Sequence, residues 1–520
     1  MLLIELYQNY IVLILYIIFI AILVELFFLE KKFIKTYFSK IKKKTWIYLL
    51  IIFLSGFAIR MFVFPHFHLM YIDEPWNMEI AKNIAYKNEP VVCRYSYPDS
   101  EACFLTQKPP GWPFLVSLLY RIFGPGSAVA FNLNVIVGSL SIILIFAFTY
   151  LVFNNEKVSL WASFLLSFAP IHVLWSGSAE TTIASAFFIL LTMIPFVIYI
   201  KTMEKNILTL AILLLVFSVF VRFENVILIL IIFLIYLKFF STKKNKIANF
   251  VNLFYPSLVL IALVAFATFE SFFISFFRPA FLQSAIDYYY LNFFSLLRDV
   301  SSGFIYLPLA LAGLFLKENN DKSNKIYVIL PMIFFFFLYL PIYTESRMAL
   351  MSGLFIIILA AYSFDRLLQI LGEYHKLLKY AIIAFLSIML GLSLFSTHNS
   401  IYEKYPRGLL ETESVSKIKN LISDEGCYMV AEYPSVVTSI SDIKGITTRN
   451  ALNNPEAILN ILNNKGCVYY FYDGYCIEWT ITPVTGSQKR CNQMLQNFKL
   501  EEKASFGSGN IKYLLYKLVG

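Results

Sequence analysis

The adjacent carboxylates Asp73 and Glu74 are the residues best placed to do chemistry in this sequence. They stand in a polar stretch, 71–111, that interrupts an otherwise apolar chain. Two acidic groups beside a membrane domain can orient and deprotonate an acceptor, or hold a divalent cation. Asp73 can also simply cap the helix that residues 75–88 predict. A cap explains one carboxylate and leaves the second unexplained, so the pair favours a function.

The composition indicates an integral membrane protein. Of the 520 residues, 59% are hydrophobic and only 15% are charged, and the mean hydropathy is +0.68. Apolar stretches of about 20 residues between short polar loops are typical of polytopic helical membrane proteins. The net charge of +10 comes largely from lysines in those loops. This is the positive-inside pattern, so the basic charge indicates topology and anionic membrane lipids, and not a nucleic-acid partner.

We expect about twelve transmembrane helices. The first apolar stretch, 10–29, is followed by a run of lysines, which predicts an uncleaved anchor with an external N-terminus. Alternation then places the acidic loop and the C-terminal tail outside as well. The other predicted spans are 46–65, 128–153, 158–175, 180–200, 207–221, 224–240, 251–275, 302–316, 326–343, 349–368 and 380–396.

Three regions follow from these spans. They are an extra N-terminal anchor with its basic cytoplasmic loop (1–45), a membrane domain (46–396) with an external loop at 66–126, and an external domain (397–520). In the last region, strand-like and helix-like runs alternate, which predicts a small α/β domain. The strand-like runs are 427–433, 467–472 and 512–518, and the helix-like runs are 411–422 and 455–462.

The external loop predicts two short helices around a rigid turn. Residues 75–88 carry an apolar stripe at helical spacing, so we expect an amphipathic helix lying flat on the membrane surface as a roof over the site. The turn is Lys108-Pro109-Pro110-Gly111, and the helix predicted after it, 112–123, is too short to cross a bilayer.

All six cysteines lie in segments predicted to be external, as disulfides in an oxidising compartment would. The two in the acidic loop form the obvious first pair, and the other four allow three connectivities. Two of those four each follow a glycine at the start of a strand-like run, so we favour joining them. A zinc site is less favoured, because no Cys-x-x-Cys spacing accompanies them. The favoured pairs are Cys93–Cys103, Cys427–Cys467 and Cys476–Cys491.

Ionisable residues are rare in membrane domains and are candidates for function there. Glu180 opens a predicted span, where its charge also suits the helix dipole. Arg222 and Glu224 flank a tight external turn and can form a local surface pair, but a guanidinium there also suits a lipid phosphate. Arg347 has the same position at the start of a late span and the same two interpretations.

The remaining candidates are weaker. His66 and His68 precede the acidic pair, although most isolated histidines are not metal ligands. Arg278 and Arg298 bracket an aromatic loop that is also typical of an interfacial belt. No cofactor is required by these residues. If a divalent metal ion takes part, its candidate ligands are Asp73, Glu74 and His66.

The order of these features resembles the GT-C superfamily of glycosyltransferases that use polyprenyl-phosphate sugars. The features are Asp-Glu in an external loop, then Lys-Pro-Pro-Gly, and then Ala-Glu-Thr, Arg-x-Glu and Ser-Arg at external helix ends. The similarity extends over about 46–396, and the protein O-mannosyltransferase and lipid A aminoarabinose transferase branches are the most similar. The extra first span and the small cysteine-rich C-terminal domain depart from these branches.

The resemblance implies a catalytic or binding role for each of the conspicuous charges. Asp73 is the expected catalytic carboxylate, with Glu74 assisting it. Lys108, Arg222 and Arg347 are expected to bind the lipid phosphate. Glu180 and Glu224 are expected near the acceptor or the sugar.

The sequence therefore predicts an inverting glycosyltransferase in the plasma membrane. It would move a sugar from a dolichyl or undecaprenyl phosphate to an external acceptor, which could be a protein, a lipid or a glycan. The alternative is a secondary transporter or lipid flippase, which requires charges near mid-span, broken helices and repeated halves. Charges gathered at one membrane face favour the enzyme.

Overall fold

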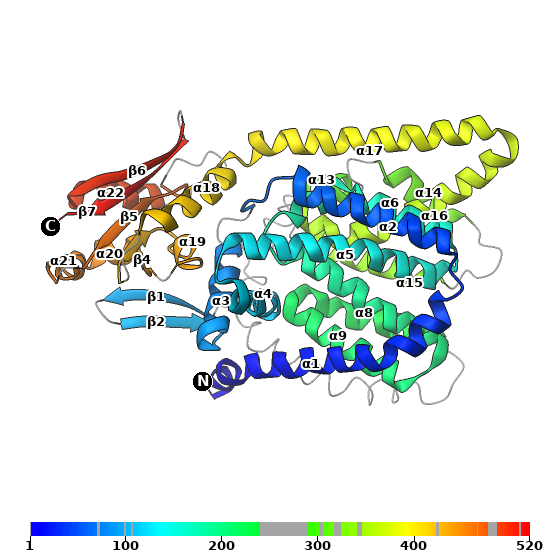
Figure 1. Ribbon diagram of the computed structural model, residues 1–520, viewed down its shortest axis with the longest axis horizontal. Coiled ribbons are helices and arrows are strands. Elements are labelled where there is room, and N and C mark those ends of the chain that lie inside the picture. Colours follow the sequence, from blue (N-terminus) through cyan, green and yellow to red (C-terminus); the bar gives the residue numbers. More distant parts are fainter. Residues whose placement is uncertain are drawn as a thin grey trace.

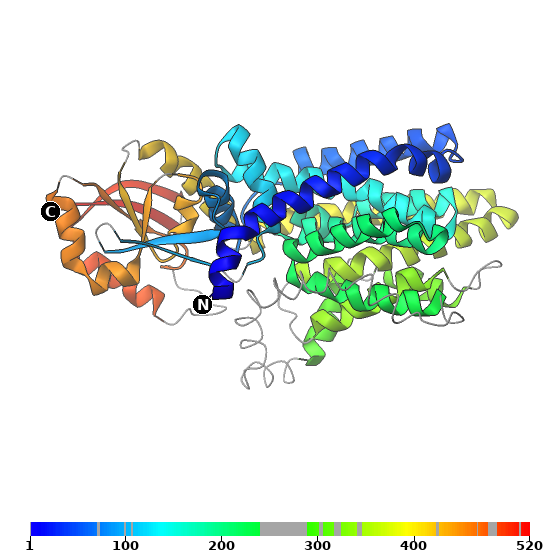
Figure 2. The same ribbon diagram turned by 90° about the horizontal axis from the view of Figure 1, so that it is seen from below.

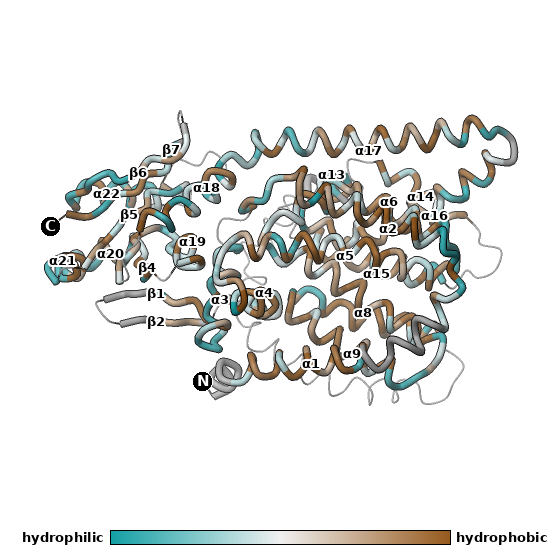
Figure 3. The backbone as a smooth tube through the Cα atoms, in the orientation of Figure 1, coloured by the Kyte–Doolittle hydropathy of each residue, from teal (hydrophilic) through white to brown (hydrophobic). Residues whose placement is uncertain are grey.

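The chain folds into two parts that lie end to end (Figure 1). In this computed structural model the helical domain extends to residue 404, and an α/β domain follows from 406. Hydrophobic residues gather on the helices of the first part, and hydrophilic ones are frequent in the second (Figure 3). The described residues are 2–69, 73–97, 100–105, 108–239, 289–300, 305–316, 324–340, 346–422, 426–441, 443–464, 466–476, 486–508 and 511–519.

Five helices among the described residues are long and apolar enough to cross a membrane, or six if a bent pair is one span. The bent pair is α6 (Glu156–Ser167) and α7 (Pro170–Ser176), which meet at 58°. The five are α2 (Lys43–Ala58) with the π-helical η1 (Ile59–Val63), α5 (Ser127–Phe153), α8 (Thr182–Thr202), η4 (Ser346–Ala349) with α16 (Leu350–Tyr374), and α17 (Lys376–Lys404).

The expected set of twelve spans is therefore recovered in part. The span expected at 158–175 is bent, because the helix breaks before Pro170, which cannot donate the hydrogen bond that a continuous helix needs. The stretch at 251–275 lies outside the described residues. Other expected stretches form helices of varied length: α1 (Leu2–Phe38), α9 (Lys205–Val221), α10 (Ile227–Phe239), α14 (Leu307–Phe315) and α15 (Ile326–Tyr339). A further helix, α13 (Tyr289–Val300), covers part of the aromatic loop.

The acidic loop forms a helix, a hairpin and a second helix. These are α3 (Asp73–Lys87), β1 (Val91–Tyr97) paired antiparallel with β2 (Ser100–Leu105), and α4 (Gly111–Phe123). The expectation of a surface helix is wrong for α3, because ten of its residues are buried, Glu74, Asn77 and Glu79 among them. The α/β domain packs against α3 and encloses it.

The α/β domain has a five-stranded mixed sheet in the order β4-β3-β5-β7-β6. The expected strands are present. The sequence did not predict β4, which is short, or β6, which is charged. The strands are β3 (Tyr428–Ala431), β4 (Lys444–Thr447), β5 (Val468–Tyr472), β6 (Leu500–Ser508) and β7 (Ile511–Leu518). The helices are α18 (Pro406–Leu421), α19 (Ser435–Thr438), α20 (Thr448–Asn453), α21 (Pro455–Asn463) and α22 (Ser487–Asn497).

The boundary between the two parts is later than the expected 396/397, because α17 continues to Lys404 as one long helix along the outside of the molecule (Figure 1). The N-terminus lies at the end of the helical domain that faces the α/β domain in both ribbon views (Figures 1 and 2). The N-terminus and the α/β domain therefore lie towards the same end of the helical domain, as the alternation of spans predicts.

The structure forms three disulfides, in the pairing that the sequence favours: Cys93–Cys103, Cys427–Cys467 and Cys476–Cys491. The first joins residues that face each other across the β1–β2 hairpin. The second joins the residues before β3 and β5, which are neighbouring parallel strands. These two bridges therefore each fix a local strand register.

A buried ion pair ties the hairpin to α3 and to the α/β domain. Glu79 accepts hydrogen bonds from Arg94 and from the Cys93 backbone, each at 3.0 Å, and from the Thr438 hydroxyl at 3.2 Å. Arg94 also donates to Ser435 on α19. Because removing one member of a buried pair leaves an uncompensated charge, this contact holds the α/β domain in place.

We predict that Glu79→Gln loosens the hairpin and α19 together, at a cost of about 3 kcal/mol in local stability. Hydrogen–deuterium exchange should become faster in 91–97 and 435–438. The matched control is Glu413→Gln, which breaks an exposed pair with Lys417 and should change exchange little. Unchanged exchange in Glu79→Gln would show that the pair does not hold the domains together.

Candidate functional site

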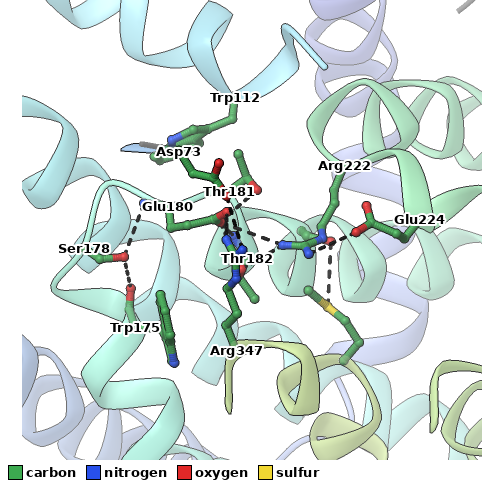
Figure 4. A network of polar contacts seen from close by, with 12 residues as sticks. Asp73, Trp112, Trp175, Ser178, Glu180, Thr181, Thr182, Arg222, Glu224 and Arg347 are labelled. Carbon is green, nitrogen blue, oxygen red and sulfur yellow. Dashed lines mark hydrogen bonds and ion pairs between the residues drawn. The ribbon is translucent and has the colours of Figure 1, made fainter. Parts of the chain in front are cut away.

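Asp73 lies between two cations at the end of the helical domain nearest the α/β domain. Its Oδ1 is 2.7 Å from Lys108 Nζ, and its Oδ2 is 3.2 Å from Arg347 Nη2. Asp73 is the first residue of α3, Lys108 precedes α4, and Arg347 lies on η4 before α16. Segments far apart in the sequence therefore meet at this carboxylate (Figure 4).

Glu180 continues the network from the other side of Arg347. It pairs with Arg347 Nη1, and its second oxygen lies 3.8 Å from Arg222 Nη1. That oxygen also accepts hydrogen bonds from the Thr182 backbone at 2.7 Å and from the Thr181 and Thr182 hydroxyls. Glu180 thus caps the start of α8, as the simpler interpretation expects, and also belongs to the charged network.

Arg222 and Glu224 form the end of the network. Arg222 Nη2 is 3.0 Å from Glu224 Oε1, and Arg222 Nη1 donates to the Thr182 hydroxyl at 2.8 Å. Arg222 is buried, so the pair is no simple surface contact. Six of the seven charged residues to which the resemblance assigns a role form one row of alternating sign: Lys108, Asp73, Arg347, Glu180, Arg222 and Glu224.

Close packing places these charges together. A Cβ at Gly111 would lie 2.6 Å from the Phe220 backbone, so the turn that carries Lys108 can lie directly against the end of α9, just before Arg222. Trp112 is fully buried, and its indole N–H donates to Ala179 O at 3.0 Å beside Glu180. This role of Trp112 could not be predicted from the sequence, because a tryptophan after a turn is also typical of an apolar core.

The cations set the ionisation of the two central acids. Burial alone raises the pKa of Asp73, but the charges of Lys108 and Arg347 outweigh it, so this pKa lies below its usual value. The pKa of Glu180 is lowered in the same way, since Arg347 and Arg222 outweigh its burial. Both carboxylates are therefore ionised at neutral pH.

Glu74 does not lie in this row, and the expectation that it assists Asp73 is not supported by the geometry. It is fully buried, and its oxygens accept hydrogen bonds from the backbone N–H groups of Leu69 and Ala179, each at 2.9 Å. One oxygen also lies 3.0 Å from His68 Nδ1. Glu74 therefore ties the start of α3 to the turn that carries Glu180.

The expected metal ligands are not brought together. The ring of His66 bonds to the Arg60 carbonyl at 2.9 Å, Asp73 contacts cations, and Glu74 contacts backbone amides. Among the described residues no group of three or more His, Cys, Asp and Glu side chains has the geometry of a metal site. The candidate set Asp73, Glu74 and His66 thus does not fit a metal ion in this arrangement.

A second acidic pair lies where the α/β domain meets α3, and the sequence analysis missed it. Both oxygens of Glu411 and the Oδ2 of Asp473 are buried with no hydrogen-bond partner among the described residues. Burial, with the charges of Asp473 and Glu74, raises the pKa of Glu411 well above its usual value. Burial raises the pKa of Asp473 from 3.8 to about 7. Acids spaced irregularly along a polar domain give no sequence signal of this kind.

Known proteins share the fold. A family profile described as dolichyl-phosphate-mannose-protein mannosyltransferase matches residues 107–272. ArnT from Cupriavidus metallidurans has 11% identity to this chain and a TM-score of 0.59, with 91% of this chain and 97% of that one covered. The archaeal oligosaccharyltransferase AglB from Archaeoglobus fulgidus has 13% identity and a TM-score of 0.54, with 92% and 75% covered. No curated protein matches the chain.

The chain has the fold of these GT-C glycosyltransferases. The ArnT structure has also been determined with undecaprenyl phosphate, and the AglB structure with an inhibitory peptide and a dolichol-phosphate. These similarities confirm the fold that the resemblance implies. The similarity to AglB extends over 92% of this chain, so the shared fold includes most of the α/β domain.

The orphaned acids predict a pH effect on the α/β domain. Because the pKa of Asp473 is raised on folding, it contributes stability that is present below pH 3.8 and lost as the pH rises to about 7. Asp473→Asn keeps an oxygen that can accept from the Tyr475 N–H, which lies 2.9 Å from Asp473 Oδ1. The variant should therefore gain thermal stability over the wild type at pH 8 and not at pH 4.

The control for this comparison is Glu501→Gln, at an exposed glutamate on β6. Its difference from the wild type should be small at both pH values. Equal stability of wild type and Asp473→Asn at pH 8 would contradict the assignment of a buried, costly carboxylate.

Proposed function

We propose that the protein is an inverting glycosyltransferase of the plasma membrane, with its active site on the extracytoplasmic face. It transfers one sugar from a dolichyl or undecaprenyl phosphate to an external acceptor, which is a protein, a lipid or a glycan. The observation that carries the proposal is Asp73, a carboxylate whose two oxygens each face a cation suited to phosphate. The GT-C fold supports lipid-phosphate-dependent transfer in general.

The cationic side chains form the donor site. Lys108, Arg347 and Arg222 alternate with carboxylates, so the carboxylates hold them in place until a phosphate binds. Arg222 Nε is buried and has no hydrogen-bond partner among the described residues, which leaves a donor for an additional oxygen. Arginine and lysine pairs with phosphate are among the stronger hydrogen bonds in proteins.

Donor binding would activate Asp73. A phosphate that takes Lys108 and Arg347 away from Asp73 removes the charges that lower its pKa. The pKa of Asp73 then rises, and the carboxylate becomes a better proton acceptor. The geometry thus favours an order in which the lipid donor binds first and the acceptor second.

The transfer step balances with these residues alone. Asp73 accepts the proton of the acceptor hydroxyl while the hydroxyl oxygen forms a bond to the anomeric carbon. The bond between that carbon and the phosphate oxygen breaks, and the polyprenyl phosphate leaves with the electron pair. Attack opposite the leaving group inverts the anomeric configuration, and the three cations stabilise the departing phosphate. No cofactor is required in this scheme.

The location of the charges also supports an enzyme over a transporter. Asp73, Glu180 and Arg222 lie at the ends of α3, α8 and α9, and not in the middle of a span. A transporter would also be expected to have several broken helices. Among the described residues, α6 and α7 form the one bent helix pair that together is long and apolar enough to cross a membrane. The network lies at the end of the helical domain that carries the α/β domain, which supports an external active site.

We predict that Asp73→Asn lowers transfer by about 10²-fold or more, since the amide cannot accept the proton. The same variant should still bind the polyprenyl-phosphate donor. Arg347→Ala should instead weaken donor binding by about tenfold or more, because a charge-assisted contact is lost. Turnover of a radiolabelled polyprenyl-phosphate sugar and donor binding would be measured on the same purified variants.

The matched control is Arg449→Ala, which removes an exposed arginine on α20 and should leave both quantities unchanged. Near-normal turnover by Asp73→Asn would refute the catalytic role of this carboxylate.

A further inference from the structure

The disulfide of the β1–β2 hairpin differs from the other two in its access to solvent. Cys103 on β2 is exposed, whereas Cys93 on the facing strand is only 7% exposed. Both residues of Cys476–Cys491 are fully buried, and Cys427–Cys467 has one fully buried and one partly exposed residue. Thiol–disulfide exchange requires that an attacking thiolate reach one of the two sulfurs. Access therefore distinguishes Cys103 from the other cysteines.

The buried sulfur of the same disulfide has donors that suit a negative charge. Asn83 Nδ2 and Lys87 Nζ, from the second half of α3, each donate to Cys93 Sγ at 3.8 Å. The Asn83 amide is itself held in place, because it also donates to the Val91 carbonyl at 2.7 Å. An ammonium group and an amide N–H both stabilise a thiolate. A disulfide opens faster when its leaving thiolate is more stable, so attack at Cys103 would release the better leaving group.

The carboxylate beside Cys93 does not cancel this effect. Glu79 accepts a hydrogen bond from the Cys93 backbone N–H at 3.0 Å, but it is paired with Arg94 at 3.0 Å. The pair is neutral as a whole and adds little field at the sulfur. Lys87 therefore supplies a positive charge next to Cys93 Sγ.

Cys103 also lies on an open strand edge. β1 lies against β4 of the α/β domain, and β2 is on the side of β1 that faces away from β4 (Figure 1). Among the described residues β2 pairs only with β1. The next residue, Phe104, is 43% exposed. An open edge can hydrogen-bond to an extended segment of another protein, and an exposed aromatic ring adds apolar contact.

We propose that Cys103 is a site of thiol–disulfide exchange with a dithiol protein that carries a Cys-x-x-Cys pair. This inference is independent of the sugar-transfer reaction. A thiolate of the partner attacks Cys103 Sγ and forms a new S–S bond to it, and Cys93 Sγ leaves with the electron pair of the broken bond. The partner's second thiolate then attacks the partner's first sulfur, and Cys103 leaves as a thiolate. The partner dithiol loses two electrons and becomes a disulfide, while Cys93 and Cys103 are reduced.

The exchange acts close to the contact between the two domains. Arg94, the residue after Cys93, pairs with Glu79 on α3 and donates to Ser435 on α19. When the bond opens, the hairpin loses its covalent cross-link, and its strand pairing and the Glu79–Arg94 pair remain. The site thus couples the redox state of a partner to the firmness of the hairpin that attaches α3 to the α/β domain.

The experiment uses the oxidised full chain in detergent and a thioredoxin whose second active-site cysteine is replaced by Ser, so that the mixed disulfide accumulates. After free thiols are alkylated, mass spectrometry of the peptides identifies the cysteine that is joined to the thioredoxin. We expect the thioredoxin on Cys103 and the alkyl group on Cys93. The bond should open about tenfold or more faster than the buried Cys476–Cys491 bond, which serves as the control within the same chain.

A second measurement tests the stabilised leaving group. Lys87→Met keeps the length of the side chain and removes the ammonium, so dithiothreitol should open Cys93–Cys103 about twofold or more slowly in this variant. The matched control is Lys417→Met, at an exposed lysine on α18, which should open at the rate of the wild type.

The outcomes separate exchange at Cys103 from a structural bridge. A thioredoxin joined to Cys93, or opening of Cys93–Cys103 no faster than that of Cys476–Cys491, would overturn the inference. An unchanged rate in Lys87→Met would overturn the role given to its ammonium in releasing Cys93.

Discussion

Charge balance in a partly buried row of side chains is the constraint on which the rest of the site depends. Three carboxylates and three cations alternate where the helical domain meets the α/β domain, and together they are neutral. They are Lys108, Asp73, Arg347, Glu180, Arg222 and Glu224. Charges taken out of water must be compensated nearby. A bound phosphate adds negative charge to this row, so it must compete with Asp73 and Glu180 for their cations.

In the proposed reaction, that competition would link donor binding to proton transfer. Asp73 would accept a proton only after its cations have found another partner, and the donor phosphate would be that partner. The same cations would then restrain the carboxylate in the empty site and stabilise the leaving group in the occupied one. Glu74, although adjacent to Asp73 in the sequence, serves this arrangement indirectly, because it fixes α3 against the backbone at Ala179.

The α/β domain packs against the segments that carry the site. The Glu79–Arg94 pair and the Cys93–Cys103 hairpin attach this domain to α3, which starts with Asp73. Thr412 on α18 also accepts a hydrogen bond from the His68 backbone N–H at 3.0 Å. A Cβ on Gly408 would lie 2.1 Å from His68 O, so α18 lies directly against this segment. In the proposed function, an acceptor would therefore approach Asp73 beside the α/β domain.

The charged residues of the site could be identified from the sequence, but the residues with which they pair could not. Asp73, Glu180, Arg222 and Arg347 could be found because ionised residues are rare at apolar helix ends. Their pairing could not be read from the sequence, since it depends on the close approach of Gly111 to α9. Glu74 was misassigned because adjacency along a chain does not put two side chains on the same face of a helix. The burial of α3 was also missed, because the α/β domain that covers it is far away in sequence.

The break between α6 and α7 was missed for a related reason. Pro170 was present in the apolar stretch, but the sequence does not show that Arg60, more than a hundred residues earlier, donates hydrogen bonds to carbonyls at the break. The disulfide pairing, by contrast, was accessible, because neighbouring parallel strands bring the residues at their starts together.

The most direct test of the central claim is a cryo-electron microscopy structure of the full chain with a non-transferable polyprenyl-phosphate sugar analogue. We predict that the phosphate lies within hydrogen-bond distance of Arg347 and at least one of Lys108 and Arg222. Asp73 should be released from Arg347 and should face the anomeric carbon on the side opposite the phosphate. A head group bound elsewhere, with the Asp73–Arg347 pair intact, would contradict the account.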